Sequence, residues 1–143
     1  MSITFRSMTV ADYEDAVALW RDAEGVGLTI GDDRPSIERY LARNPGLSLM
    51  AAADGRLAGA VLCGHDGRRG YIHHLAVGAE FRGRGIGREL VARCIAGLIE
   101  ADIPRCHILV YTRNTAGQGF WQAIGWTLRS DLTVMSRNTQ PEG

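Results

Sequence analysis

The sequence lacks an excess of charge of either sign. Sixteen basic and sixteen acidic side chains give its 143 residues a formal net charge of zero. A chain without a net electrostatic field has no general attraction for nucleic acid or for an anionic membrane surface, so we expect neither as a partner. Basic side chains do gather locally, between residues 82 and 88. A cluster of that size suits a small anion better than a polymer.

Cysteine is scarce, and long apolar runs are absent. The three cysteines, Cys63, Cys94 and Cys106, are an odd number in apolar stretches and form no Cys-x-x-Cys pair. They indicate reduced core thiols, and we expect no disulfide framework and no metal site. No segment has the length of a membrane-spanning helix, and the N-terminus lacks the basic-then-apolar pattern of a signal peptide. The sequence therefore predicts a cytoplasmic protein.

Three motifs of common enzyme classes are also missing. The glycine-rich stretch at residues 82–88 has no Gly-Lys followed by serine or threonine, which argues against magnesium–nucleotide chemistry. Counted from Gly83, a dinucleotide fingerprint needs glycine at the position that Arg88 occupies, so that match fails too. No Gly-x-Ser-x-Gly nucleophile motif is present, which argues against a covalent intermediate.

The same glycine-rich stretch is nevertheless suited to holding a phosphate or pyrophosphate. It follows a strand pattern at residues 71–77 and opens a helix whose apolar residues recur at helical spacing. The N–H groups at a helix start have no internal partners and carry the positive end of the helix dipole. Glycine lets a ligand approach them closely, and arginine adds fixed positive charge. The predicted phosphate site comprises Arg82, Gly83, Arg84, Gly85, Ile86, Gly87 and Arg88.

Strand and helix patterns alternate along the rest of the chain. Strands are predicted at residues 3–6, 47–53, 57–63, 71–77, 106–111, 126–128 and 132–136, with helices opening near residues 9, 33, 85 and 114. The early strands are joined by tight turns and the later ones by helices, so we expect an α/β fold whose sheet mixes antiparallel and parallel pairs. A single domain over residues 1–143 is expected, with a loose tail at 138–143.

Both the loop and the element order resemble a known family. Arg82, Gly85 and Gly87 occupy the defining positions of an Arg/Gln-x-x-Gly-x-Gly/Ala motif, and Leu-Ala-Val precedes the loop at residues 75–77. In this context the stretch resembles the GCN5-related N-acetyltransferase (GNAT) family, and the likeness extends over nearly the whole chain. It implies a twisted, mixed and mostly antiparallel sheet of about six to seven strands with a splayed central pair, flanked by about four helices.

The resemblance also implies how acetyl-coenzyme A would bind as co-substrate. In the family the loop holds the pyrophosphate, and the pantetheine arm pairs with the backbone of the central strand in place of a missing strand. Asn114 matches the family asparagine that contacts the coenzyme, although it could serve only as a helix cap. The implied cofactor-binding residues are Leu75, Ala76, Val77, the loop from Arg82 to Arg88, and Asn114.

The sequence departs from the family at the usual proton donor. Residues 114–126 match a second motif, but Trp121 stands where many members have a tyrosine that protonates the leaving thiolate. An indole N–H donates a hydrogen bond without releasing its proton at neutral pH. Tyr111 is a candidate substitute acid, and water is another. A thiolate is a tolerable leaving group, so the change need not abolish turnover.

The proton acceptor is open among several groups. Attack requires a neutral amine, so a proton must leave the amine directly or through water. Family members often place a glutamate or histidine on the central strand, where His73 and His74 stand. Strand alternation predicts that His73 shares a face with Tyr71 and that His74 points the other way, which favours His73 as the base. Glu24 and a water chain are alternatives.

The implied activity is that of an acyltransferase. An acetyl group would move from acetyl-coenzyme A to a primary amine by direct attack in a ternary complex. Trp121 supports an alternative, a non-catalytic sensor of coenzyme A or acyl-coenzyme A, and a purely structural protein is a third reading. The acceptor is expected to be a small-molecule or peptide amine, and the protein a monomer or homodimer. Loop carboxylates could attract a cationic amine or simply be solvated: Glu24, Asp32, Asp33 and Asp131.

Overall fold

The computed structural model describes residues 2–140 of the chain and divides it into two units. The first unit extends to Tyr111 and the second begins at Thr112. Of the predicted loose tail, residues 138–140 form neither helix nor strand, and residues 141–143 lie outside the described residues. One domain over the whole chain stays a prediction.

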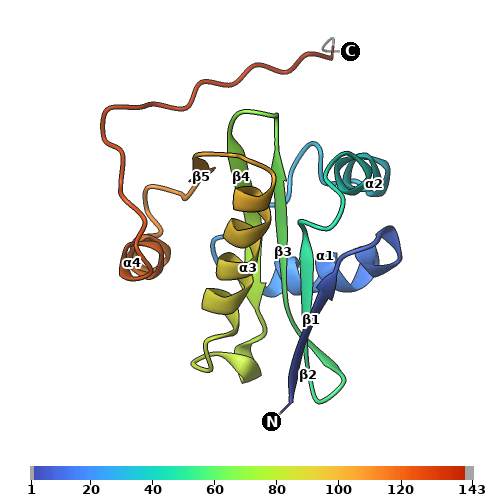
Figure 1. The fold of residues 1–143 in the computed structure, drawn as a ribbon. Helices are drawn as coiled ribbons and strands as arrows, with labels where there is room; N and C mark the ends of the chain where they lie inside the picture. The colour runs from blue at the N-terminus through green and yellow to red at the C-terminus, as the bar shows by residue number, and fades with distance from the viewer. Residues whose placement is uncertain (1, 141–143) are drawn as a thin grey trace. The chain divides into compact units, whose positions relative to one another are not determined.

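The first unit is built on one mixed sheet, drawn in Figure 1. Its five strands follow the order of the chain across the sheet. The first four pair antiparallel, and the fifth pairs parallel with the fourth. Their bounds are β1 (Ile3–Ser7), β2 (Leu49–Ala53), β3 (Arg56–His65), β4 (Gly70–Val77) and β5 (Cys106–Ile108). This confirms the predicted α/β class and the mostly antiparallel sheet.

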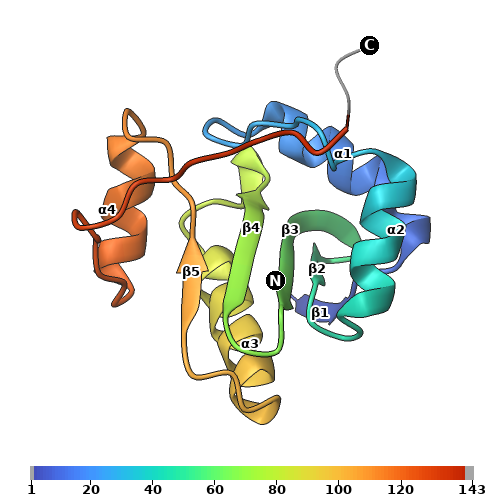
Figure 2. The same ribbon diagram turned by 90° about the horizontal axis from the view of Figure 1, so that it is seen from above.

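Helices cover both faces of this sheet (Figures 1 and 2). Those of the first unit are α1 (Tyr13–Asp22), α2 (Arg34–Arg43) and α3 (Ile86–Glu100), and α4 (Thr115–Ala123) belongs to the second unit. A Cβ at Gly59 or Gly70 would point at α3 side chains, whereas Ala60 packs in a cluster with residues of α1. Neighbouring positions of β3 therefore face different helices, as the period of two along a strand requires.

Short polar signals in the sequence begin and end these elements. Thr9 and Asp12 form a capping box where a helix was predicted to open, and Asp12 also pairs with Arg6 at 2.7 Å. Asp54 and Gly55 join β2 to β3 with φ angles of 50° and 80°. A two-residue turn with both central φ angles positive is the arrangement that Asp-Gly favours in hairpins. The early half of the sheet thus follows directly from local sequence.

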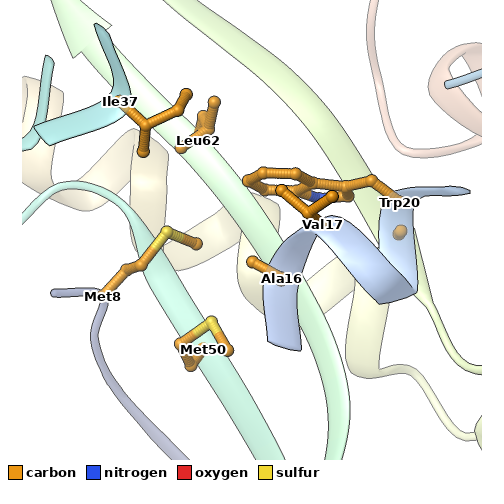
Figure 3. Close-up of a cluster of buried hydrophobic side chains, with 9 residues drawn as sticks. Met8, Ala16, Val17, Trp20, Ile37, Met50 and Leu62 are labelled. Atoms are coloured by element: carbon orange, nitrogen blue, oxygen red, sulfur yellow. The ribbon is translucent and has the colours of Figure 1, made fainter. Parts of the chain in front are cut away.

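A buried apolar cluster lies between the sheet and helices α1 and α2 (Figure 3). Trp20 of α1 is fully buried, and Ala76 joins the cluster from β4. Its members are Met8, Ala16, Val17, Trp20, Ile37, Met50, Ala60, Leu62 and Ala76. Full burial of a valine, leucine, isoleucine or methionine side chain contributes roughly 2 kcal/mol to the stability of the fold. The packing fixes β4 against α1, which matters for the site described below.

The expected six to seven strands are not found among residues 2–140, which form five. Residues 126–128 and 132–136, predicted as closing strands, form no strand. A strand needs a neighbour for its backbone hydrogen bonds, and residues 112–140 contain a helix but no other strand. β5 also ends at Ile108 instead of continuing to residue 111. Among residues 2–140, no helix combines the length and apolar character needed to cross a membrane.

Candidate functional site

β5 leaves β4 after only three residue pairs. Gly70, Tyr71 and Ile72 pair with residues 106–108, and beyond Ile72 no strand among residues 2–140 pairs with β4 on that side. This is the splay that the family resemblance implies. The backbone of β4 from His73 to Val77 therefore borders a gap in the sheet. A strand edge of this kind can pair with the amides of an extended ligand.

The glycine-rich loop leads from the end of β4 into α3. Gly83 and Gly85 have φ angles of 77° and 79°, in the left-handed region that favours glycine, and a Cβ on either would meet nothing within 4 Å. Gly85 is the N-cap of α3 and, as a glycine, provides no side-chain cap. Ile86 is buried, while the four residues before it are exposed. Open space thus lies beside Gly83 and Gly85 at the start of α3, as the approach of an anion to a helix start requires.

One loop arginine already touches the strand edge. The Nε of Arg82 donates a long hydrogen bond, 3.4 Å, to the carbonyl of Val77. Val77 is one of the residues whose backbone the resemblance assigns to the pantetheine arm. The loop and the free strand edge are therefore contiguous, and a ligand that spans both would meet Arg82 between them.

A bulge interrupts β4 just before this edge. Ala60 of β3 pairs with Ala76, but Leu62 pairs with His73, so Val61 alone lies opposite two residues of β4. One of those two is His74, whose φ of 54° is left-handed. Such a conformation costs about 1–3 kcal/mol in a residue other than glycine and needs support from its surroundings. An extra residue also shifts the alternation of side chains along the strand.

The prediction that His74 points away from His73 is therefore wrong. The His74 ring lies 5.2 Å from the ring of Trp20 on α1, and the His73 ring lies 6.4 Å from that of Tyr40 on α2. The two histidine rings are 6.4 Å apart at an angle of 63°. Both occupy the side of the sheet that α1 and α2 cover. Simple alternation fails here because the bulge adds one residue.

His74 is paired with a carboxylate from the loop between α1 and α2. Its Nε2 lies 2.9 Å from Oδ1 of Asp32, and the two side chains are only 17% and 15% exposed. Asp32 is itself held, because its Oδ2 accepts from the N–H of Thr29 and its carbonyl accepts from the hydroxyl of Tyr13. Sequence reasoning named Asp32 as a loop carboxylate but missed this pairing, for which no local signal exists.

His73 has aromatic neighbours in place of a carboxylate. Its ring stacks on that of Tyr71, with centroids 5.9 Å apart and planes 3° from parallel. Burial lowers the pKa of His73, and the neighbouring His74 lowers it further, while Asp32 acts in the opposite direction. His73 is therefore neutral at pH 7, the state in which an imidazole can accept a proton.

Tyr111 follows β5, and its side chain contacts the loop between α1 and α2. Its hydroxyl lies against Gly27, where an added Cβ would collide with it. The close approach explains glycine at residue 27, which has no unusual φ angle. Tyr111 is half exposed, so part of its side chain is accessible to a ligand. Glu24, which was predicted as an alternative proton acceptor, lies after α1 and is exposed.

Two further predicted residues lie in the second unit. The side chain of Asn114 accepts a hydrogen bond from the N–H of Gly117 at 2.9 Å, which confirms its role as the N-cap of α4. A Cβ on Gly117 would collide with that side chain, so the cap itself accounts for this glycine. Trp121 packs edge-on against Trp126, with ring centroids 4.9 Å apart. The predicted contact of Asn114 with coenzyme stays a prediction.

The cysteines are free thiols, two of them buried. Hydrogen bonding with the Cys94 thiol and burial raise the pKa of Cys63, and burial raises that of Cys106 to about 12. Protonated thiols are weak nucleophiles, so neither cysteine suits a covalent step at neutral pH. Among residues 2–140, histidines, cysteines and carboxylates nowhere gather in a group of three that could hold a metal ion.

Comparisons with known proteins agree with this geometry. The model of the acetyltransferase (GNAT) family matches residues 13–126. An acetyltransferase of Pectobacterium atrosepticum is 32% identical over 126 residues, which is 88% of this chain and 89% of that protein. Among solved structures, the PaiA N-acetyltransferase of Thermoplasma acidophilum, in complex with coenzyme A, has a TM-score of 0.79 at 19% identity, covering 90% of this chain and 92% of its own. AAC(6')-Iy, in complex with a coenzyme A bisubstrate analogue, has a TM-score of 0.76 at 19% identity, covering 98% and 100%.

Proposed function

Since the chain belongs to the acetyltransferase (GNAT) family, we propose that it transfers an acetyl group from acetyl-coenzyme A to a primary amine. The observation that carries the proposal is the continuous path from the free edge of β4 to the uncapped start of α3. An extended pantetheine arm fits the first, and a pyrophosphate fits the second. That the PaiA and AAC(6')-Iy structures were solved with coenzyme A or an analogue of it supports the same donor.

Each part of the coenzyme has its own group of residues in this proposal. The pantetheine amides pair with the backbone of Leu75, Ala76 and Val77, and the pyrophosphate sits on the loop from Arg82 to Arg88. Asn114 contacts the coenzyme from the start of α4. Backbone groups carry most of the recognition, so only substitutions that block the approach or change the charge should disturb it.

The chemistry is direct transfer. The amine nitrogen attacks the thioester carbonyl, the new C–N bond forms, the C–S bond breaks, and coenzyme A leaves as a thiolate that takes up a proton. The amine loses one proton to a histidine at the bulge of β4, for which the sequence favours His73. Tyr111 is the candidate donor to the thiolate, and Trp121 is not, because an indole retains its proton at neutral pH.

A non-catalytic sensor of coenzyme A is the second candidate, and Trp121 is the observation that favours it. Release of free thiol from acetyl-coenzyme A across an amine panel separates the two functions. The panel covers polyamines, amino acids, aminoglycosides and peptide N-termini, since AAC(6')-Iy is an aminoglycoside N-acetyltransferase. We expect saturable, amine-dependent thiol release with at least one class. Coenzyme A binding without release for any amine would identify a sensor. Absence of binding at millimolar coenzyme A would overturn both.

A further inference from the structure

The two histidines at the bulge of β4 differ in one respect that bears on proton transfer. His74 has a carboxylate partner, Asp32, and His73 is surrounded by the rings of Tyr71, Tyr40 and His74. We propose that His74 is the group that takes the proton from the amine, and that Asp32 is the positioning residue that orients it. This inference rests on the proposed acetyl transfer and refines which histidine serves it.

The charge created by proton transfer favours the paired histidine. An imidazole that accepts a proton becomes a cation, and a cation in a poorly solvated site is costly unless an opposite charge lies beside it. Asp32 supplies that charge at 2.9 Å from Nε2 of His74. A proton on His73 would instead sit among aromatic rings and next to a second imidazole. Of the two rings, His74 therefore gains a proton at the lower cost.

The pairing also decides which nitrogen of His74 receives the proton. An ionised carboxylate only accepts hydrogen bonds, so the Nε2 that faces Asp32 carries the hydrogen. Nδ1 is then the unprotonated nitrogen, and its lone pair takes the proton of the amine as the C–N bond forms. The imidazolium is held by Asp32 until Nδ1 returns the proton to solvent. The proton thus passes from the amine to His74 and then to water, and no other group is needed for this transfer.

The bulge and the loop hold this arrangement in place. The left-handed backbone of His74 brings its ring to the α1–α2 side, directly before the strand edge at Leu75. Three groups face the ring: Asp32 from the loop, Trp20 from α1, and His73 from its own strand. Of these three, Asp32 and His73 are the titratable groups. The His74 side chain is 17% exposed, which leaves part of it accessible to an acceptor.

The kinetic test compares His74→Ala, Asp32→Asn and the matched control His73→Ala, with the confirmed amine, over a range of pH. We expect His74→Ala to lower kcat by about a hundredfold or more while KM for acetyl-coenzyme A is unchanged. Added imidazole should restore part of the lost turnover in His74→Ala and none in His73→Ala. Asp32→Asn should fall between the wild type and His74→Ala and shift the acidic limb of the pH–rate profile. Wild-type enzyme with imidazole, and imidazole without enzyme, correct for direct aminolysis.

Other results would overturn the inference. If His74→Ala and Asp32→Asn lower the melting temperature but leave kcat and the pH profile unchanged, the pair only stabilises the loop between α1 and α2. If imidazole rescues His73→Ala and not His74→Ala, His73 is the acceptor. An inactive wild type would instead defeat the proposed function. A ¹⁵N spectrum that correlates ring nitrogens with ring protons needs no substrate, and hydrogen on Nδ1 instead of Nε2 of His74 would also overturn the inference.

Discussion

The two ends of β4 present different kinds of chemical group. The end that continues into the loop, residues 75–88, is called the coenzyme end because we propose that coenzyme A binds there, and it offers backbone groups: a free strand edge and a helix start without a side-chain cap. Its histidine end, formed by Tyr71, His73 and His74 together with Asp32, offers side chains held by long-range contacts. The coenzyme end is formed by one contiguous stretch of sequence. The histidine end depends on a bulge and on a partner 42 residues away. Substitutions at the coenzyme end should therefore weaken coenzyme A binding, whereas substitutions at the histidine end should lower the rate of acetyl transfer.

Outside the pair of His74 and Asp32, the largest effect should come from a charge placed at the coenzyme end. Gly85→Asp adds a side chain and a negative charge at the N-cap of α3, where we expect the pyrophosphate, and should weaken coenzyme A binding by at least about tenfold. Gly67→Asp is the matched control, since Gly67 also has a positive φ and open space around it but lies in the β3–β4 turn. Calorimetry on both variants checks this. Equal affinities would show that the loop does not hold the coenzyme.

A second substitution tests how the loop above the histidine end is held. Gly27→Ala puts a Cβ into the hydroxyl of Tyr111 and should lower the free energy of unfolding by about 1–3 kcal/mol. Combining it with Tyr111→Ala should return part of that stability, because the collision disappears. Chemical denaturation of the two single variants and the double variant gives the coupling. Strict additivity would mean that the two residues do not touch in solution.

Trp121 provides a smaller effect. Trp121→Phe keeps an aromatic ring against Trp126 and removes only the indole N–H and some contact area. Turnover should stay within about tenfold of the wild type, because an indole does not supply the proton to the thiolate. Thiol-release kinetics, with coenzyme A affinity measured in parallel, decide the matter. A collapse of kcat at unchanged affinity would make Trp121 part of the chemistry.

The comparison also shows what could be predicted from sequence. The helix that begins at the glycine-rich loop and the tight turn between the second and third strands are local signals, and both were predicted correctly. The side of the sheet on which His74 lies was not, because a bulge is set by packing between β3 and β4 and leaves no periodic trace. The closing strands failed for a related reason: residues 126–136 alternate like strands, but a strand also needs a neighbour.

The smallest effect concerns pH and stability at the histidine end. Burial lowers the pKa of His73 in the folded state, so the unfolded chain binds protons more readily. The stability linked to this histidine is fully present above its unfolded pKa, near 6.5, and is lost as the pH falls through the lower folded pKa. The melting temperature of His73→Gln should therefore fall less than that of the wild type between about pH 7 and pH 5. Parallel melting curves would contradict this.

The most direct test of the division between the two ends is coenzyme A calorimetry on the wild type, His74→Ala and Asp32→Asn. If the coenzyme end binds through backbone groups of its own, all three proteins should bind with the same affinity within about twofold, even where turnover is lost. A loss of affinity of about tenfold or more in either variant, with the fold intact, would show that the two ends of β4 are not separate and would contradict the account.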